Sequence, residues 1–284
     1  MNFILNWYYS RTYQLRDSIE ASLFICTIIS TIFTILGVSL SVIEDFGILI
    51  KLGILISCFI LIVVLSYWGF GKIYSKKICL NFNNTLVEIS YGNLFEVEGW
   101  KVIGCDTHFD TRVDDVVISK KSLHGQLVLN HGDSGRIYDL VKEEAKKSSI
   151  NCDDNGLYNF PLGTVIRYDS TVDHQTYLML SMTKLNSRYE AYTDMKTFIN
   201  VLMTMWKEIN RVYASHDIVL PVLGTGISRF VNNNKSEAEL LKAMLYTLYN
   251  SGVVFNSRIK IVIYGNPKNT SLYEYKKIFS TMMR

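Results

Sequence analysis

Two long apolar segments near the N-terminus dominate the pattern of hydrophobic and polar positions. Residues 21–43 contain no charged residue, and after Glu44, Asp45 and Lys51 a second uncharged segment covers residues 52–71. Each segment reaches the length of about 20 residues that a helix needs to cross a bilayer. Because the connection between them is short, the pattern predicts an antiparallel transmembrane hairpin.

The charges that flank these segments predict their orientation. Arg11 and Arg16 precede the first segment, whereas Lys72, Lys76 and Lys77 follow the second. The connection carries two acidic residues and a single lysine. Since cytoplasmic flanks are enriched in Lys and Arg, we expect both termini to be cytoplasmic and the hairpin to lie in the cell (inner) membrane.

One face of the first segment carries small and polar residues at alternating spacings of three and four. This face consists of Thr27, Ser30, Thr34, Gly37 and Ser41. Small residues let membrane helices approach closely, so the face could pack within the hairpin or between subunits of an oligomer. Alternatively, it could line a water-accessible path, which would require several subunits because two helices do not enclose a pore.

From residue 78 onward the pattern changes to that of an α/β domain, so we divide the chain into a membrane hairpin (1–77) and a cytoplasmic domain (78–284). Short apolar runs predict strands, and longer amphipathic runs predict helices. Strands are expected at 78–80, 86–90, 100–105, 164–168, 175–181, 217–222 and 258–264, and helices at 134–147, 191–213 and 236–252. This order predicts a mixed sheet with helices on its faces.

The overall composition agrees with a membrane segment joined to a soluble domain. The 284 residues are 49% hydrophobic and only 19% charged. A net charge of +3 is too small to indicate nucleic-acid binding. The five cysteines lack metal-type spacing and are expected to be reduced thiols of a cytosol-facing protein.

A glycine-rich turn follows the apolar strand near residue 220. Gly224 and Gly226 allow backbone N–H groups to surround an anion, and Thr225, Ser228 and Arg229 can add donors. Because loops at the carboxyl ends of such strands bind ligands, we interpret the turn as a phosphate site. It matches neither the dinucleotide fingerprint nor the P-loop, and a simple connection remains the alternative.

Polar residues offer no positive argument for catalysis. His124 lies in a segment expected to be a loop, where a solvated or locally bonded side chain is the simpler interpretation. Asp106, Asp110, Asp114 and Asp115 could be catalytic or metal-binding carboxylates, but a solvated loop is favoured for them as well. No nucleophile motif or zinc-type spacing is present, and we expect neither a metal nor a cofactor.

Four segments together resemble a divergent macro domain, which has a three-layer α/β fold with a mixed sheet. They are residues 218–230, 91–94, 104–111 and 121–126. A macro domain behind two transmembrane helices resembles the membrane-anchored effectors of Thoeris anti-phage defence. The most specific part of the resemblance is Leu220–Ile227.

The resemblance implies that the domain binds an ADP-ribose derivative. The loop from Gly224 to Arg229 would hold the diphosphate, Asn93 would take the adenine position, and residues 106–110 would lie near the distal ribose. The loop at 123–126 would face Asn93 across the site. The full ligand-binding set expected on this basis is Asn93, Leu94, Asp106, Phe109, Asp110, Leu123, His124, Gly125, Gly224, Thr225, Gly226, Ile227, Ser228, Arg229 and Asn266.

Departures from the hydrolytic macro domains favour a sensor over an enzyme. The Asn-Ala-Ala-Asn motif is missing, and the glycine-rich first loop is reduced to Gly125. In this defence family a companion TIR-domain protein makes an ADP-ribose-type signal, which the effector senses before it disrupts the membrane in abortive infection. We therefore expect an oligomeric, nucleotide-binding membrane protein that contacts lipid. A membrane-tethered hydrolase of ADP-ribose derivatives is the alternative.

Overall fold

The computed structural model describes residues 2–35, 47–73, 77–82, 84–153, 156–186, 191–226, 229–230, 235–264 and 272. The chain divides into two compact units. One is built on residues 1–78 and contains two long helices, whereas the other is built on residues 79–266 and contains the sheet.

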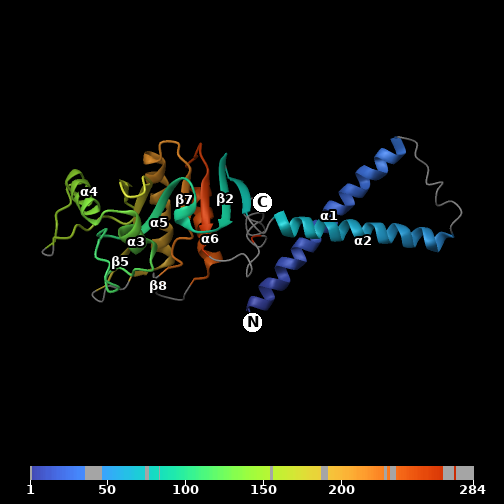
Figure 1. The fold of residues 1–284 in the computed structure, drawn as a ribbon, viewed down its shortest axis with the longest axis horizontal. Coiled ribbons are helices and arrows are strands. Elements are labelled where there is room, and N and C mark those ends of the chain that lie inside the picture. Colours follow the sequence, from blue (N-terminus) through green and yellow to red (C-terminus); the bar gives the residue numbers. More distant parts are fainter. Residues whose placement is uncertain are drawn as a thin grey trace. The chain divides into compact units, whose positions relative to one another are not determined.

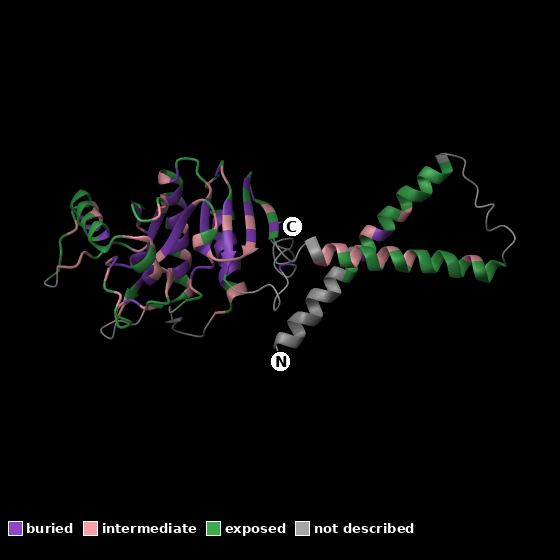
Figure 2. Cartoon of the chain, in the orientation of Figure 1, coloured by how far each residue is buried: buried purple, intermediate pink, exposed green. Residues whose placement is uncertain are grey.

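The first unit contains helices α1 (Asn2–Ile35) and α2 (Ile48–Ile73). Within the described residues, the helix long and apolar enough to cross a membrane is the stretch Ile48–Gly71 of α2, with a mean hydropathy of 3.0 and no part of its most apolar window buried. Figure 2 shows its largely exposed surface. The apolar part of α1, Ser18–Thr34, is shorter, and residues 36–43 of the first expected span lie outside the described residues. The structure therefore describes one candidate span where the sequence predicts two.

Serine side chains mark the contact between α1 and α2. Ser18 and Ser22 are fully buried, and the Ser22 hydroxyl lies 3.3 Å from that of Ser66 on α2. By contrast, Thr27 and Thr34 of the predicted polar face are exposed, and each donates to a carbonyl of its own helix at 2.9 Å.

Ser30 is exposed as well, and Gly37 and Ser41 lie outside the described residues. Within the described residues, Ser18 and Ser22 are thus buried at the contact between the two helices, whereas Thr27, Ser30 and Thr34 of the predicted face are not.

The second unit is organised around one mixed sheet (Figure 1). Its strands are β1 (Lys77–Phe82), β2 (Thr85–Tyr91), β3 (Trp100–Asp106), β4 (Val165–Asp169), β5 (Thr176–Leu185), β6 (Ala191–Thr193), β7 (Ile218–Pro221), β8 (Arg229–Phe230) and β9 (Ile259–Ile263). They lie in the order β1-β2-β9-β7-β3-β5-β6-β8, and β4 pairs with β5. The central strands β2, β9, β7, β3 and β5 run parallel, whereas β4 and β6 are antiparallel to β5.

Apolar residues cover both faces of this sheet, as the near-continuous burial of β3 requires. On one face lie α5 (Met195–Val212) and α6 (Glu237–Asn250), each of which buries an apolar stripe. These helices are joined in the core by the Trp206 indole N–H, which donates to the Thr247 hydroxyl at 3.0 Å.

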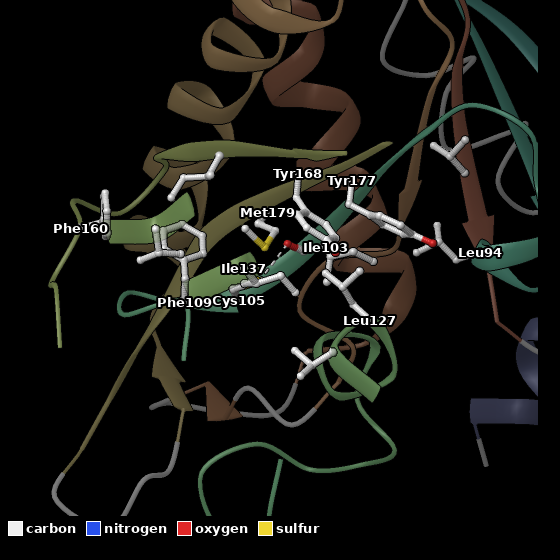
Figure 3. Packing of buried hydrophobic residues seen from close by; sticks show 14 of the residues in the cluster. Leu94, Ile103, Cys105, Phe109, Leu127, Ile137, Phe160, Tyr168, Tyr177 and Met179 are labelled. Carbon is white, nitrogen blue, oxygen red and sulfur yellow. Dashed lines mark hydrogen bonds between the residues drawn. The ribbon is translucent and has the colours of Figure 1, made fainter. Parts of the chain in front are cut away.

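The opposite face carries one further long helix and three short helical elements. They are the 3-10 turn η2 (Leu94–Glu96), α3 (Leu123–Gln126), the π-helical turn η3 (Leu127–His131) and α4 (Ser134–Lys147). Figure 3 shows how Leu127 and Ile137 from these elements meet Ile103, Tyr177 and Met179 of the sheet.

Two local predictions are wrong, each because of a helix cap. The helix expected from residue 191 begins at Met195. Residues 191–193 form β6 instead, and Asp194 caps the helix because its carboxylate accepts from the Thr197 N–H. The segment expected to be a loop at 122–126 forms α3, which Ser122 caps. The predicted capping box at Ser236 is confirmed.

Candidate ligand-binding site

Three of the predicted ligand-binding segments follow parallel strands of the sheet. Asn93 comes after β2, Asp106 ends β3, and Gly224 comes after β7. The carboxyl ends of parallel strands meet at one edge of a sheet, which is where ligands bind in α/β folds. The topology thus brings these three segments to the same edge.

The glycine turn after β7 is shaped by packing on one side and open on the other. Gly224 has a φ of +86°, and a Cβ there would touch Leu240 and Phe198 at 3.4 Å, so glycine suits both the backbone and the space. Among the described residues, a Cβ at Gly226 would meet no atom within 4 Å. The Thr225 hydroxyl donates to the Val222 carbonyl at 2.8 Å and so stabilises the turn itself.

The rest of the predicted diphosphate loop is described only in part. Ile227, Ser228 and Asn266 lie outside the described residues. Arg229 begins β8, but its side chain is also outside them. Its role as a donor to the ligand therefore stays a prediction.

The turn after β2 uses its polar side chain locally. Asn93 caps η2, because its Oδ1 accepts from the Phe95 N–H at 3.2 Å while its Nδ2 donates to Glu96 at 3.0 Å. Leu94 is 3% exposed and belongs to the hydrophobic core. A ligand at this turn would therefore meet an Asn93 amide whose orientation the cap already fixes.

The Asp106 carboxylate is buried at the end of β3, with a side-chain exposure of 5%. Its Oδ1 accepts from the His108 N–H at 2.7 Å and lies 3.4 Å from His108 Nδ1. Burial alone would raise the pKa of Asp106, but the hydrogen bonds from the His108 ring and backbone oppose it, and the pKa is lowered. Asp106 is therefore a buried carboxylate rather than the solvated one expected.

His124 is buried beside it at the start of α3. The Ser122 hydroxyl accepts from the Gly125 N–H at 2.9 Å and fixes this short helix, and α3 packs against β3. Gly125 is required here because a Cβ would overlap the Ser119 carbonyl oxygen. His124 Nδ1 consequently lies 4.0 Å from Asp106 Oδ2, and its side chain is only 7% exposed. The solvated-loop interpretation of His124 is wrong.

Burial lowers the pKa of His124, although the carboxylates of Asp106 and Asp110 and the backbone of Asp110 act in the opposite direction. At neutral pH the ring is thus uncharged next to a charged carboxylate. Among the described residues, neither Asp106 Oδ2 nor His124 Nε2 has a hydrogen-bond partner. We call these two atoms the open pair.

The neighbouring residues satisfy one another. Asp110 is buried and binds Arg112 through both carboxylate oxygens, with the shortest contact 2.6 Å from Nη2 to Oδ2. Phe109 is buried against Phe160 in an edge-to-face contact, so it belongs to the core. Asp114 is exposed and caps its own turn through the Val116 and Val117 N–H groups, and Asp115 is exposed too, as expected for solvated residues.

Sequence reasoning missed His108 and Arg112, the partners of the two buried carboxylates. Each lies two residues after its aspartate, a spacing at which a side chain can bond to the following backbone and side chain. Leu123 is half-buried and packs against the core. In the part of the chain that is described, no cluster of three or more His, Cys, Asp or Glu side chains could hold a metal ion.

This geometry brings two buried polar atoms, Asp106 Oδ2 and His124 Nε2, close to the strand edge that also carries the glycine turn after β7. Residues 87–264, more than half of the chain, match the family described as Thoeris protein ThsA, Macro domain. The chain belongs to this family.

A member of the ThsA macro-domain family from Bacillus amyloliquefaciens (strain Y2), Thoeris protein ThsA, is 29% identical over 239 residues. The match covers 81% of this chain and 79% of the relative. A macrodomain structure from Oceanobacillus iheyensis with ADP superposes with a TM-score of 0.50 at 13% identity, covering 73% of this chain and 98% of the other. That similarity confirms the predicted macro-like α/β fold with a mixed sheet.

Proposed function

We propose that the protein is a membrane effector of Thoeris anti-phage defence. Its macro domain senses an ADP-ribose-type nucleotide made by a companion TIR-domain protein. The nucleotide-bound protein then disrupts the inner membrane in abortive infection. Family membership supports the Thoeris role, and the apolar helix α2 supports the membrane location. Both termini are cytoplasmic in this proposal, since the flanking Lys and Arg residues favour that orientation.

The observation that carries the proposal is the open pair at the same sheet edge as the Gly226 turn. A buried polar group without a partner costs about 1–3 kcal/mol. A nucleotide that supplies the missing hydrogen bonds recovers this cost on binding. The diphosphate would lie against the turn at Gly224–Gly226, where the open space at Gly226 leaves room for close backbone approach.

Membrane disruption requires more than binding. A ligand shifts an equilibrium between two arrangements of the hairpins only by the difference between its affinities for them. Two helices per chain do not enclose a pore, so the proposal includes a homo-oligomer. Thr27, Ser30 and Thr34 of α1 are exposed in the single chain and are available for contacts between subunits.

The full chain in detergent, titrated with ADP-ribose in a calorimeter, tests the sensor half of this proposal. We expect saturable binding with one site per chain and no change in the nucleotide afterwards. The full chain in liposomes loaded with a quenched dye tests the membrane half, where ligand is expected to increase dye release. Absence of binding to ADP-ribose and its derivatives would refute the sensor.

The second candidate is a hydrolase of ADP-ribose derivatives, and one observation favours it. The Asp106 carboxylate and the His124 imidazole are buried 4.0 Å apart, and the pKa of each is lowered. Perturbed pKa values of neighbouring groups are common in active sites. Chromatography of the nucleotide after incubation with the protein separates the candidates. Turnover supports the hydrolase, and tight binding of an unchanged nucleotide supports the sensor.

A further inference from the structure

The turn η2 is so short that side chains outside it must fix its position. Leu94 is buried in the core and Asn93 caps the turn, whereas Phe95 is only partly buried. The Phe95 ring lies flat against the His131 imidazole, with the ring centroids 4.1 Å apart and the planes 7° from parallel. His131 therefore supports the turn from outside.

Hydrogen bonds hold the His131 ring in this orientation. Its Nδ1 lies 2.9 Å from Asp173 Oδ2, which also accepts from the Tyr177 hydroxyl at 2.5 Å. Asp173 Oδ1 accepts from the Gln175 N–H at 3.1 Å. Burial acts to raise the pKa of Asp173, but the hydrogen bonds from Tyr177, Gln175 and His131 oppose it, and the pKa is lowered. The carboxylate is thus ionised at neutral pH and accepts the proton on His131 Nδ1.

This network is anchored on a central strand of the sheet. Tyr177 belongs to β5 and is fully buried, and the centroid of its ring lies 6.3 Å from that of Phe95. The Ser170 hydroxyl donates to the His131 carbonyl, so the main chain of His131 is fixed as well. Connected hydrogen bonds of this kind make the groups that they join more rigid. The contacts therefore run from β5 through Asp173 and His131 to Phe95 of η2.

The order of the strands places η2 at one end of the candidate site. Along the sheet β2 is followed by β9, β7 and β3. The turn at Gly224, after β7, thus lies between Asn93, after β2, and Asp106, at the end of β3. A diphosphate at Gly224 leaves one half of an ADP-ribose-type nucleotide towards Asn93 and the other half towards Asp106. A substitution that loosens η2 should therefore affect only the first half.

We infer that His131 is a positioning residue for the nucleotide, because it fixes Phe95 and thereby the turn that carries Asn93. This inference rests on the proposed function and adds a residue that acts on the ligand through another side chain. A turn that is already in place binds without the entropic cost of ordering it. Loss of the stack should weaken binding about two- to tenfold, the range expected for one aromatic stack.

Displacement calorimetry of the full chain in detergent with ADP-ribose, AMP and ribose 5-phosphate tests the inference. AMP and ribose 5-phosphate each represent one half of ADP-ribose. His131→Ala removes both the ring and the bond to Asp173. We expect the affinities for ADP-ribose and for one of the two halves to fall about two- to tenfold, whereas the affinity for the other half stays unchanged.

A double-mutant cycle with Phe95→Leu assigns this loss to the stack. Phe95→Leu removes the other ring but keeps an apolar side chain, so it should weaken ADP-ribose binding by a similar factor. Because the two rings act as a unit, the double variant should bind ADP-ribose about as well as either single variant. Losses that multiply would show that Phe95 and His131 act separately, which would overturn the inference.

His216→Ala is the matched control. His216 is exposed, and its imidazole stacks on the Trp100 ring with the centroids 4.6 Å apart. Trp100 begins β3, so this stack lies at the amino end of the strand, away from the edge that carries Asp106. His216→Ala should lower the thermal midpoint about as much as His131→Ala but leave all three affinities unchanged.

The outcomes separate this inference from the proposed function. If none of the three compounds binds the unaltered chain, both are wrong. If ADP-ribose binds the unaltered chain and His131→Ala equally well, the sensor stands and His131 is not a positioning residue. An equal loss of affinity for AMP and ribose 5-phosphate in His131→Ala would show a merely structural role and would also overturn the inference.

Discussion

Gly125→Ala is the substitution for which the structure gives the clearest expectation. A Cβ at this position would overlap the Ser119 carbonyl oxygen and lie 3.0 Å from the Ser119 carbonyl carbon and 3.2 Å from the Lys120 Cα. All three are backbone atoms, so no side chain can move aside. Either α3 or the preceding turn has to shift.

The loss of stability follows from the hydrogen bonds that the Ser119 carbonyl accepts in this turn. The Ser119 carbonyl accepts from the Ser122 N–H at 3.0 Å and from the Ser122 hydroxyl at 2.7 Å. Loss of these two bonds costs about 0.5–1.5 kcal/mol each, and overpacking in a tight interior costs about 1–3 kcal/mol. Since partial relaxation saves some of this energy, we expect destabilisation of about 2–4 kcal/mol.

Urea unfolding of the full chain in detergent, followed by Trp fluorescence, measures this effect. Gly226→Ala is the matched control, because a Cβ there meets none of the described atoms within 4 Å, and its stability should match that of the wild type. The displaced α3 would also carry His124 away from Asp106, so affinity for ADP-ribose should fall. A Gly125→Ala protein with wild-type stability and affinity would refute the close approach on which the site geometry depends.

Three further predictions concern the glycine turn, the pH dependence and the core. Gly226→Ala should weaken ADP-ribose binding at least several-fold in calorimetry while stability is unchanged, and unaltered affinity would show that no ligand approaches this backbone. The Asp106 carboxylate raises the pKa of His108, so His108 stabilises the fold below its unfolded pKa of about 6.5 and this contribution disappears as pH rises through the folded pKa. His108→Asn should therefore lower the thermal midpoint more at pH 5.5 than at pH 8.5, and an equal effect at both pH values would contradict the ion pair. Thr247→Val leaves the Trp206 indole N–H unpaired in the core and should cost about 1–3 kcal/mol in urea unfolding, whereas an unchanged midpoint would show that this bond contributes nothing.

The parts of the fold that follow from local pattern could be read from the sequence. Ser236 and Glu239 have the spacing of a capping box and form one. The apolar runs that become β3, β7 and β9 are buried at nearly every position, whereas β2 alternates between buried and partly exposed positions, and both patterns read directly as strands. The start of α5 was missed because the periodicity of a helix does not show where a cap such as Asp194 interrupts it.

The candidate site depends on contacts between segments distant in sequence, and periodicity carries no information on these. Asp106 and His124 each read as solvated loop residues because the segments around them are polar. Only the packing of α3 against β3 brings them together and buries them. The partners His108 and Arg112 lie close in sequence and could have been found from their spacing.

Nucleotide binding acts on the membrane only if it is coupled to the arrangement of the hairpins. As for any ligand that binds only the folded state, nucleotide at 100 times its dissociation constant should stabilise the folded domain by about 2.7 kcal/mol. That stabilisation alone does not change the hairpins, since a ligand with equal affinity for both arrangements shifts neither. Coupling is reciprocal, so an arrangement of the hairpins that releases dye must also bind the nucleotide more tightly, and by the same factor. Equal affinities in detergent-dispersed chains and in membrane assemblies that release dye would therefore show that the nucleotide does not drive the change between arrangements, even if the macro domain binds ADP-ribose as proposed.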